Sequence, residues 1–152
     1  MFTNTCMAHS PQVLVDSSVI ISALNSPTGA PAHILELGRI KTLTLVIIPY
    51  IVAEVEDVLK RKFPLLASRW KNVQQEKIFH ILSNPTVDEL KQAASLTTDP
   101  NDVPIIAAGF VHRVDFLVTL DRKHFLNSQK LLQNKKFKTL HASELIERYK
   151  RD

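Results

Sequence analysis

Three short apolar runs along the chain predict buried strands, and two of them end directly on an aspartate. The runs cover residues 13–15, 42–48 and 116–120. Asp16 directly follows the first run, and Asp121 directly follows the third. Bulky and β-branched side chains without polar alternation are typical of strands that are covered on both faces. Residues 139–141 predict a shorter last strand.

Helix-like segments separate these strands. The predicted helices cover residues 17–24, 32–39, 50–62, 66–82, 88–96, 103–111 and 142–149. Pro49 ends the second strand and can occupy the first turn of the helix that follows. Residues 103–111 are apolar on every side, so we expect that helix to be almost wholly buried. The alternation of strands and helices predicts an α/β fold.

Composition indicates one ordinary globular domain. The chain has 152 residues, of which 45% are hydrophobic and 22% charged, a size that a single domain commonly reaches. We expect a flexible tail over residues 1–11 and a single domain over residues 12–150. The single cysteine, Cys6, excludes an internal disulfide and a cysteine-based zinc site, which favours a reducing compartment. No targeting signal or bilayer-length apolar run is present, so the expected location is cytoplasmic, away from membranes.

The net charge of +4 suits an anionic partner such as RNA but also occurs in enzymes without one. Lys and Arg outnumber the acidic residues from Arg122 to the end of the chain. For any single basic residue, a solvated surface position is the more common explanation. Charge alone therefore does not decide the function.

Several carboxylates stand at the junctions between the predicted elements. They are Asp16, Glu54, Asp99, Asp102 and Asp121. Right-handed crossovers place the carboxyl ends of parallel strands at one edge of a sheet, so these side chains can converge on one crevice. Clustered carboxylates repel one another, and either raised pKa values or a bound divalent cation relieves the repulsion. Ligands that are all oxygen suit Mg²⁺ or Mn²⁺.

Each of these residues also has a simpler interpretation. Asp16 can cap the helix that begins at residue 17, and Asp99 and Asp102 can serve the start of the buried helix. Asp121 can be a solvated turn residue or an ion-pair partner. These alternatives stay open at the level of sequence.

Glu54 is harder to explain in this way. It lies on the flank of the apolar stripe of its helix, between Ile51 and Val58. A carboxylate at that margin points partly toward the sheet, where it is costly without a partner. Extension to solvent beside Arg61 is the alternative.

Four segments together resemble the motifs of PIN-domain proteins, in particular the VapC-like toxins of toxin–antitoxin systems. The segments are VLVDSSVIISAL, PYIVAEVEDVLKRKF, DPNDVPIIAAG and FLVTLDRKHF. They stand in the order and spacing of the family, from about residue 13 to residue 141. The resemblance implies a three-layer α/β/α, RNase H-like domain with a central parallel sheet of about four or five strands.

The resemblance also implies a metal-dependent ribonuclease. Its catalytic and metal-binding carboxylates match Asp16, Glu54, Asp102 and Asp121, and Mg²⁺ or Mn²⁺ would be the cofactor. Water activated by the metal would hydrolyse the phosphodiester. This chemistry needs no catalytic histidine, and the six histidines of the chain show no paired spacing.

Residues around these carboxylates match the family in part. Asp99 matches an acidic position before the third motif, while Ser18 and Thr119 would hold carboxylates or water. Many members have Asn in place of Ser18, Gly in place of Leu120 and Ala in place of Gly109. None of these departures removes a carboxylate.

The family further suggests partners for the chain. Arg122 and Lys123 are the basic residues best placed by sequence to attract an RNA backbone. A small antitoxin protein would cover and inhibit the acidic pocket, and the early helices would form a homodimer.

Other classes of function fit less well. A PIN-like module that binds RNA or protein without cleavage is the main alternative, raised by the departures at Ser18 and Leu120. A phosphoacceptor receiver domain would need adjacent acidic residues near the first strand, and a haloacid-type phosphatase would need Asp where Ser18 stands. With three glycines and no G-x-G-x-x-G, the chain lacks a dinucleotide-binding motif.

Overall fold

A parallel five-stranded sheet forms the centre of the molecule in the computed structural model, which describes residues 10–122, 125 and 128–150. The strands lie in the order β4-β3-β2-β5-β6, and every neighbouring pair is parallel. Their bounds are β2 (Gln12–Val15), β3 (Thr44–Ile47), β4 (Phe79–Ile81), β5 (Phe116–Thr119) and β6 (Lys138–His141).

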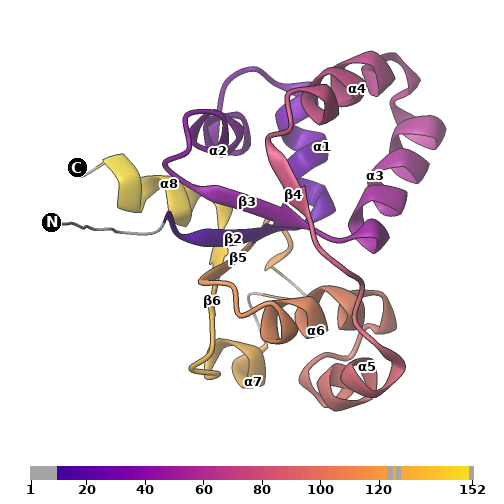
Figure 1. Cartoon of the computed structure of the whole chain (residues 1–152), viewed down its shortest axis with the longest axis vertical. Helices are drawn as coiled ribbons and strands as arrows, with labels where there is room; N and C mark the ends of the chain where they lie inside the picture. Colours follow the sequence, from indigo (N-terminus) through magenta and orange to yellow (C-terminus); the bar gives the residue numbers. More distant parts are fainter. Residues whose placement is uncertain (1–9, 123–124, 126–127, 151–152) are drawn as a thin grey trace, which may run out of the picture.

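Helices cover both faces of this sheet (Figure 1). The α-helices are α1 (Ser17–Asn25), α2 (Ala30–Arg39), α3 (Pro49–Lys62), α4 (Ala67–Gln75), α5 (Val87–Ala93), α6 (Val103–Val111), α7 (Gln129–Leu132) and α8 (Ala142–Lys150). Short 3₁₀ turns occur at η1 (Pro64–Leu66), η2 (Ala94–Leu96) and η3 (Pro100–Asp102). In Figure 1, α1 to α4 lie on one side of the sheet and α5 to α7 on the other. This arrangement confirms the predicted three-layer α/β/α fold with a parallel sheet.

The central strand β2 is the most enclosed part of the sheet. Val13 and Val15 are fully buried, and Leu14 is 1% exposed, as expected for a strand covered on both faces. The chain leaves β2 for β3 and β4 on one side and returns to β5 and β6 on the other. The order therefore reverses between β2 and β5. In open α/β sheets, ligands bind at such a switch point, outside the carboxyl ends of the strands.

The predicted helix over residues 66–82 is wrong in its second half. The helix α4 ends at Gln75, Lys77 adopts a left-handed backbone with φ of 56°, and β4 follows at Phe79. The apolar residues Ile78, Phe79 and Leu82 fit a helical face equally well, so the pattern could not separate the two structures. Pairing with β3 decided the outcome, because β3 offers an open edge that Phe79–Ile81 completes.

Smaller differences concern the ends of helices. The second helix begins at Ala30, two residues earlier than predicted, because Pro31 fits its first turn. Helix α5 begins after Thr86, whose side chain forms a capping box with Glu89. Helix α7 was not predicted.

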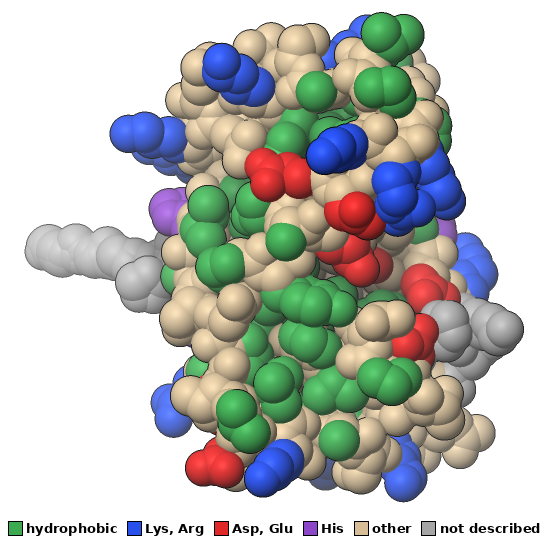
Figure 2. Space-filling view, turned by 90° about the vertical axis from the view of Figure 1, so that its right-hand side faces the viewer, with side chains coloured by type: hydrophobic (Ala, Val, Ile, Leu, Met, Phe, Trp, Pro, Cys, Tyr) green, Lys and Arg blue, Asp and Glu red, His purple; other side chains and the backbone are tan. Residues whose placement is uncertain are grey.

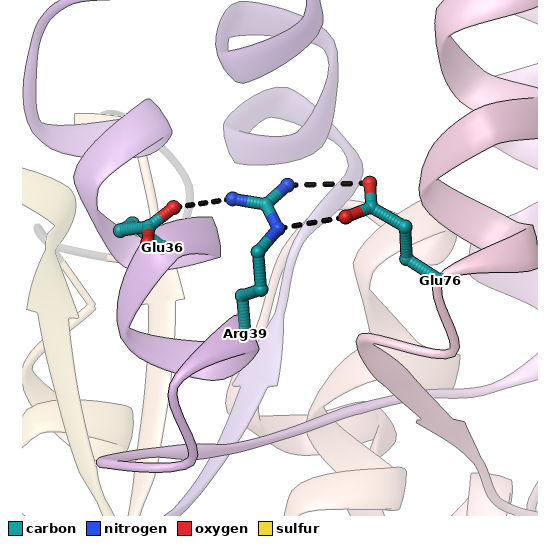
Figure 3. A network of polar contacts seen from close by, with 3 residues as sticks. All are labelled: Glu36, Arg39 and Glu76. Carbon is teal, nitrogen blue, oxygen red and sulfur yellow. Dashed lines mark hydrogen bonds and ion pairs between the residues drawn. The ribbon is translucent and has the colours of Figure 1, made fainter.

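An ion-pair network joins α2 to the turn between α4 and β4 (Figure 3). The Arg39 guanidinium donates from Nε to Glu76 Oε2 at 2.8 Å and from Nη2 to Glu76 Oε1 at 3.3 Å. It also pairs with Glu36, one turn earlier on the same helix. Lys77, the residue that ends the helical conformation, directly follows Glu76, so the network holds the chain where it turns into β4.

The two described residues of the predicted tail are attached to the domain. Ser10 Oγ donates to the Lys41 carbonyl at 2.8 Å, and the Pro11 carbonyl accepts from Thr44 N at 2.9 Å. Residues 1–9, the rest of that tail, lie outside the described residues. Within the described part of the chain, no helix has the length and apolar character needed to cross a membrane.

Candidate active site

Asp16 stands where β2 ends, next to the reversal of strand order. Its backbone N–H donates to the Val118 carbonyl at 3.0 Å, which continues the pairing of β2 with β5 by one residue. The side chain is only 5% exposed. The strand therefore delivers a carboxylate into the interior at the carboxyl edge of the sheet.

Both oxygens of this carboxylate accept hydrogen bonds. Oδ1 accepts from Ser17 N at 2.9 Å, while Oδ2 accepts from Ser18 Oγ at 2.9 Å and from Thr119 Oγ1 at 2.8 Å. Asp16 thus caps α1, as the simpler interpretation proposed, and also belongs to a polar cluster. Burial raises the pKa of Asp16 despite these hydrogen bonds, and the negative charge of Glu54 raises it further.

The two hydroxyls that contact Asp16 also bind the backbone after β5. Ser18 Oγ accepts from Leu120 N at 3.1 Å, and Thr119 Oγ1 accepts from Asp121 N at 3.0 Å. Each hydroxyl therefore receives one hydrogen bond and donates another to the same carboxylate oxygen. Serine supplies this link at the position where many family members have Asn.

Glu54 reaches the same cluster from α3. Ser17 Oγ donates to Glu54 Oε1 at 2.5 Å, so a residue of α1 connects the carboxylates of two different elements. Arg61, the alternative partner proposed from sequence, pairs with Asp57 at 2.9 Å. The half-buried Glu54 side chain therefore points toward the end of β2, as its place beside the apolar stripe predicted.

The segment before α6 brings two further carboxylates. Asp102 is 8% exposed and precedes α6 without capping it through its side chain. Asp99 caps the 3₁₀ turn by accepting from Asn101 N at 2.9 Å. The helix-start interpretation fits both residues, because Asp99 caps the 3₁₀ turn through its side chain and Asp102 stands buried at the N-cap position of α6, where the helix dipole favours a negative charge.

Tyr50 is a site residue that the sequence interpretation missed. Its hydroxyl donates to the Asn101 carbonyl at 2.9 Å, and its backbone N–H donates to Asn84 Oδ1 at 3.0 Å. Burial raises the pKa of the Tyr50 phenol. Nearby negative charges raise it further, and in decreasing order they are those of Glu54, Asp102, Asp99 and Asp16. This phenol therefore lies within electrostatic range of carboxylates at the end of β2, on α3 and in the segment before α6. The available signal was an aromatic residue directly after the strand-ending Pro49 and one helical turn before Glu54.

Asp121 and Arg122, which were also predicted as site residues, directly follow β5 and the next residue, Leu120. Asp121 is half-buried, and Arg122 is exposed. Burial lowers the pKa of His141, and the positive charge of Arg122 lowers it further, so Arg122 lies near the end of β6. Lys123 lies outside the described residues.

Figure 2 views the molecule from the side on which α3, α5 and α6 lie in Figure 1. Acidic side chains extend from the upper middle of this face toward its right-hand edge, Lys and Arg side chains border them above and on the right, and hydrophobic side chains lie below them. An acidic band with basic side chains along its margin can hold a cation and attract a polyanion to it.

The donor chemistry of the cluster suits a hard cation. Carboxylate and hydroxyl oxygens gather at the end of β2, and Mg²⁺ and Mn²⁺ prefer oxygen ligands. Within residues 10–122, 125 and 128–150, however, no three His, Cys, Asp or Glu side chains form a group able to hold a metal ion. The assignment of Asp16, Glu54, Asp102 and Asp121 to a metal site therefore stays a prediction.

Comparison with protein families decides the classification. The family model described as a PIN domain matches residues 12–123, which include all of the predicted carboxylates. The chain belongs to the PIN-domain family. This confirms the family that the four sequence motifs indicated. The comparison with curated proteins gives no match for this sequence.

Solved structures with the same fold come from several organisms. This PIN domain resembles PAE2754 from Pyrobaculum aerophilum with a TM-score of 0.62 and 20% identity, over 94% of this chain and 98% of that one. It resembles VapBC2 from Rickettsia felis, solved with a DNA fragment from its promoter, with a TM-score of 0.65 and 15% identity, over 86% and 98%. It also resembles VapC20 of Mycobacterium tuberculosis, a toxin that cleaves the sarcin-ricin loop, with a TM-score of 0.54 and 15% identity, over 73% and 91%. These likenesses show that the PIN domain has the fold of VapC proteins.

Proposed function

We propose that this PIN domain is a ribonuclease that depends on Mg²⁺ or Mn²⁺, and that it is the toxin of a toxin–antitoxin pair. The observation that carries the proposal is the pair of carboxylates Asp16 and Glu54, joined by Ser17 at the switch point of a PIN fold. Two carboxylates that share a partly buried place repel each other, and a bound divalent cation would relieve that repulsion. Membership of the PIN family and the VapC-like fold support nuclease chemistry there.

In this proposal, Asp16 and Asp102 hold the cation, and Glu54 and Asp121 complete its shell directly or through water. A bound divalent cation supplies Lewis acidity toward water and phosphate. Ser18 and Thr119 fix the orientation of Asp16 by donating to its Oδ2. Hydrogen bonds from neighbouring residues to a metal-binding side chain keep that side chain in place and strengthen metal binding.

The basic margin of the acidic face would bind the RNA backbone, with Arg122 and Lys123 as contributors. Such contacts weaken as the salt concentration rises, because each one releases a counterion from the nucleic acid. A small antitoxin that covers the acidic face is the proposed protein partner. Formation of a homodimer through the early helices is proposed on the same family grounds.

The test measures cleavage of total bacterial RNA and of a synthetic single-stranded RNA by the purified full chain. We expect cleavage with Mg²⁺ or Mn²⁺ and none with EDTA. The variants Asp16→Asn and Asp102→Asn should each reduce the rate by about 100-fold or more, since even partners outside the metal shell are worth about 10–100-fold.

Asp57→Asn is the matched control, because Asp57 is an exposed carboxylate of α3 that pairs with Arg61 and is not one of the four predicted metal ligands. It should cleave at the wild-type rate. Cleavage that survives EDTA, or equal rates in all four proteins, contradicts the metal-dependent mechanism. Metal-dependent RNA binding without any cleavage would instead identify a binding module.

A further inference from the structure

We propose that Tyr50 is a positioning residue that fixes Asp102 relative to Glu54 by tying α3 to the turn before α6. The inference rests on the proposed metal-dependent function, and it assigns a role to a residue outside the four carboxylates. Its basis is a single hydroxyl that bridges two elements, each of which carries one of the acidic residues.

The first half of the bridge lies on α3. Tyr50 stands in the first turn of the helix, after Pro49, and Glu54 follows four residues later. Residues spaced by four lie on the same face of a helix, so Tyr50 and Glu54 are neighbours along one side of α3. The Tyr50 N–H donates to Asn84 Oδ1 in the chain that follows β4. The backbone at the start of α3 is therefore fixed independently of the contact that the Tyr50 hydroxyl makes.

The second half of the bridge is the turn η3. The Tyr50 hydroxyl donates to the carbonyl of Asn101, which forms the peptide bond with Asp102. The same turn is closed by Asp99, whose side chain accepts from Asn101 N and whose carbonyl accepts from Asp102 N at 3.0 Å. A shift of the Asn101 carbonyl would therefore move the backbone of Asp102 directly.

The chemistry of tyrosine suits this place better than that of a basic residue. A phenol donates a hydrogen bond without carrying a charge, and burial together with the surrounding carboxylates raises the pKa of Tyr50, which keeps it neutral. A Lys or Arg at this position would form ion pairs with the carboxylates and compete with a cation for them. The neutral hydroxyl holds the turn without placing a positive charge beside the carboxylates.

The test compares Tyr50→Phe with Tyr149→Phe in the full chain. Both substitutions remove one phenolic hydroxyl, and Tyr149 lies on α8, where it packs against the core. Hydrogen exchange of the backbone amides of residues 97–99 and 101–103 is measured without metal or RNA. Mn²⁺ affinity is measured by calorimetry without RNA, and kcat and KM for RNA cleavage are measured at saturating and limiting Mn²⁺.

We expect Tyr50→Phe to exchange faster at residues 101 and 102, because the turn loses its tether to α3. It should bind Mn²⁺ about 10-fold more weakly, as loss of a supporting contact typically does. The rate at limiting Mn²⁺ should fall, with KM for RNA unchanged. Tyr149→Phe should match the wild type in exchange at these residues and in Mn²⁺ affinity.

Unchanged exchange and unchanged Mn²⁺ affinity in Tyr50→Phe overturn the inference. A raised KM for RNA with both of those measurements unchanged also overturns it, because the hydroxyl then contacts RNA. If the wild type binds Mn²⁺ but cleaves no RNA, the proposed function fails, while faster exchange and weaker Mn²⁺ binding in Tyr50→Phe still support the positioning role. Wild type that binds no Mn²⁺ overturns both.

Discussion

Ser17 donates a hydrogen bond from its hydroxyl to Glu54 Oε1 at 2.5 Å, and its backbone N–H donates to Asp16 Oδ1 at 2.9 Å. One small residue therefore contacts two carboxylates that come from different elements. Ser17 is only 8% exposed, so the residue that connects the two carboxylates is itself largely shielded from water. Burial raises the pKa of Asp16, and the hydrogen bond from the Ser17 backbone opposes that rise.

Replacement of Ser17 by alanine should release Glu54 from the cluster. We expect Ser17→Ala to lower the free energy of unfolding by about 1 kcal/mol, the net value of one hydrogen bond. It should weaken Mn²⁺ binding by about 10-fold, because the supporting contact of a carboxylate is lost. Urea unfolding and calorimetric titration with Mn²⁺ measure the two effects. Ser26→Ala, which removes an exposed hydroxyl bonded to the Thr28 carbonyl, is the control and should leave Mn²⁺ affinity unchanged. Equal affinities in Ser17→Ala and the wild type would refute the role of this contact.

Gly109 departs from the alanine that is usual in the family, and the structure supplies a reason. A Cβ at this position would lie 2.8 Å from Cε2 and 2.9 Å from Cζ of the Phe137 ring. Phe137 is 5% exposed, and its ring packs edge-on against Phe110 with a centroid distance of 4.9 Å. The ring has little room to move aside.

Gly109→Ala should therefore destabilise the domain although alanine favours helices. The gain in helix propensity is about 1 kcal/mol, whereas overpacking of a filled core costs about 1–3 kcal/mol. We expect a net loss in the free energy of unfolding, measured by urea denaturation. In a Phe137→Leu background the smaller side chain should reduce that loss. A Gly109→Ala protein more stable than the wild type would show that the ring moves freely.

The Arg39–Glu76 pair should give stability a specific pH dependence. The hydrogen bond from Arg39 lowers the pKa of Glu76 below its ordinary value of 4.5. Because the folded state has the lower pKa, this stabilisation is complete above pH 4.5 and is lost as the pH falls through the folded pKa. The side chains are 41% and 42% exposed, so the contribution is about 0.5 kcal/mol.

Urea unfolding of the wild type and Arg39→Gln across pH 3 to 7 measures this term. The difference between the two proteins should be largest at neutral pH and should shrink as the pH falls below 4.5. In a Glu76→Gln background, which lacks the titrating group, the same substitution should show a smaller pH dependence. A difference that grows toward acidic pH would contradict the assignment.

The sequence correctly predicted the elements that are recognisable from a local run of apolar residues. The apolar run before Asp16, the all-apolar helix of residues 103–111 and the strand before Asp121 appear in the structure nearly as predicted. An element that is buried on every side has a continuous run of apolar side chains. Such a run can be recognised in the sequence without knowledge of the segments that pack against it. The family followed from the order of four such motifs.

Strand β4 was missed because its three residues have no preference that a short window can detect. Only Phe79 of β4 is partly buried, while His80 and Ile81 are exposed. The backbone of β3 supplies the hydrogen-bond partners that make this segment a strand. A contact between residues more than thirty positions apart is invisible to local periodicity.

The sequence by itself determined which carboxylates stand at element junctions, because strand ends and helix starts are local events. Only the tertiary structure decided how these residues are connected. Ser17 reaches Glu54, Thr119 reaches Asp16, and Tyr50 reaches the turn of Asp102. Each of these contacts depends on the parallel pairing of β3, β2 and β5 in one sheet, which places side chains from distant segments at the same edge of that sheet.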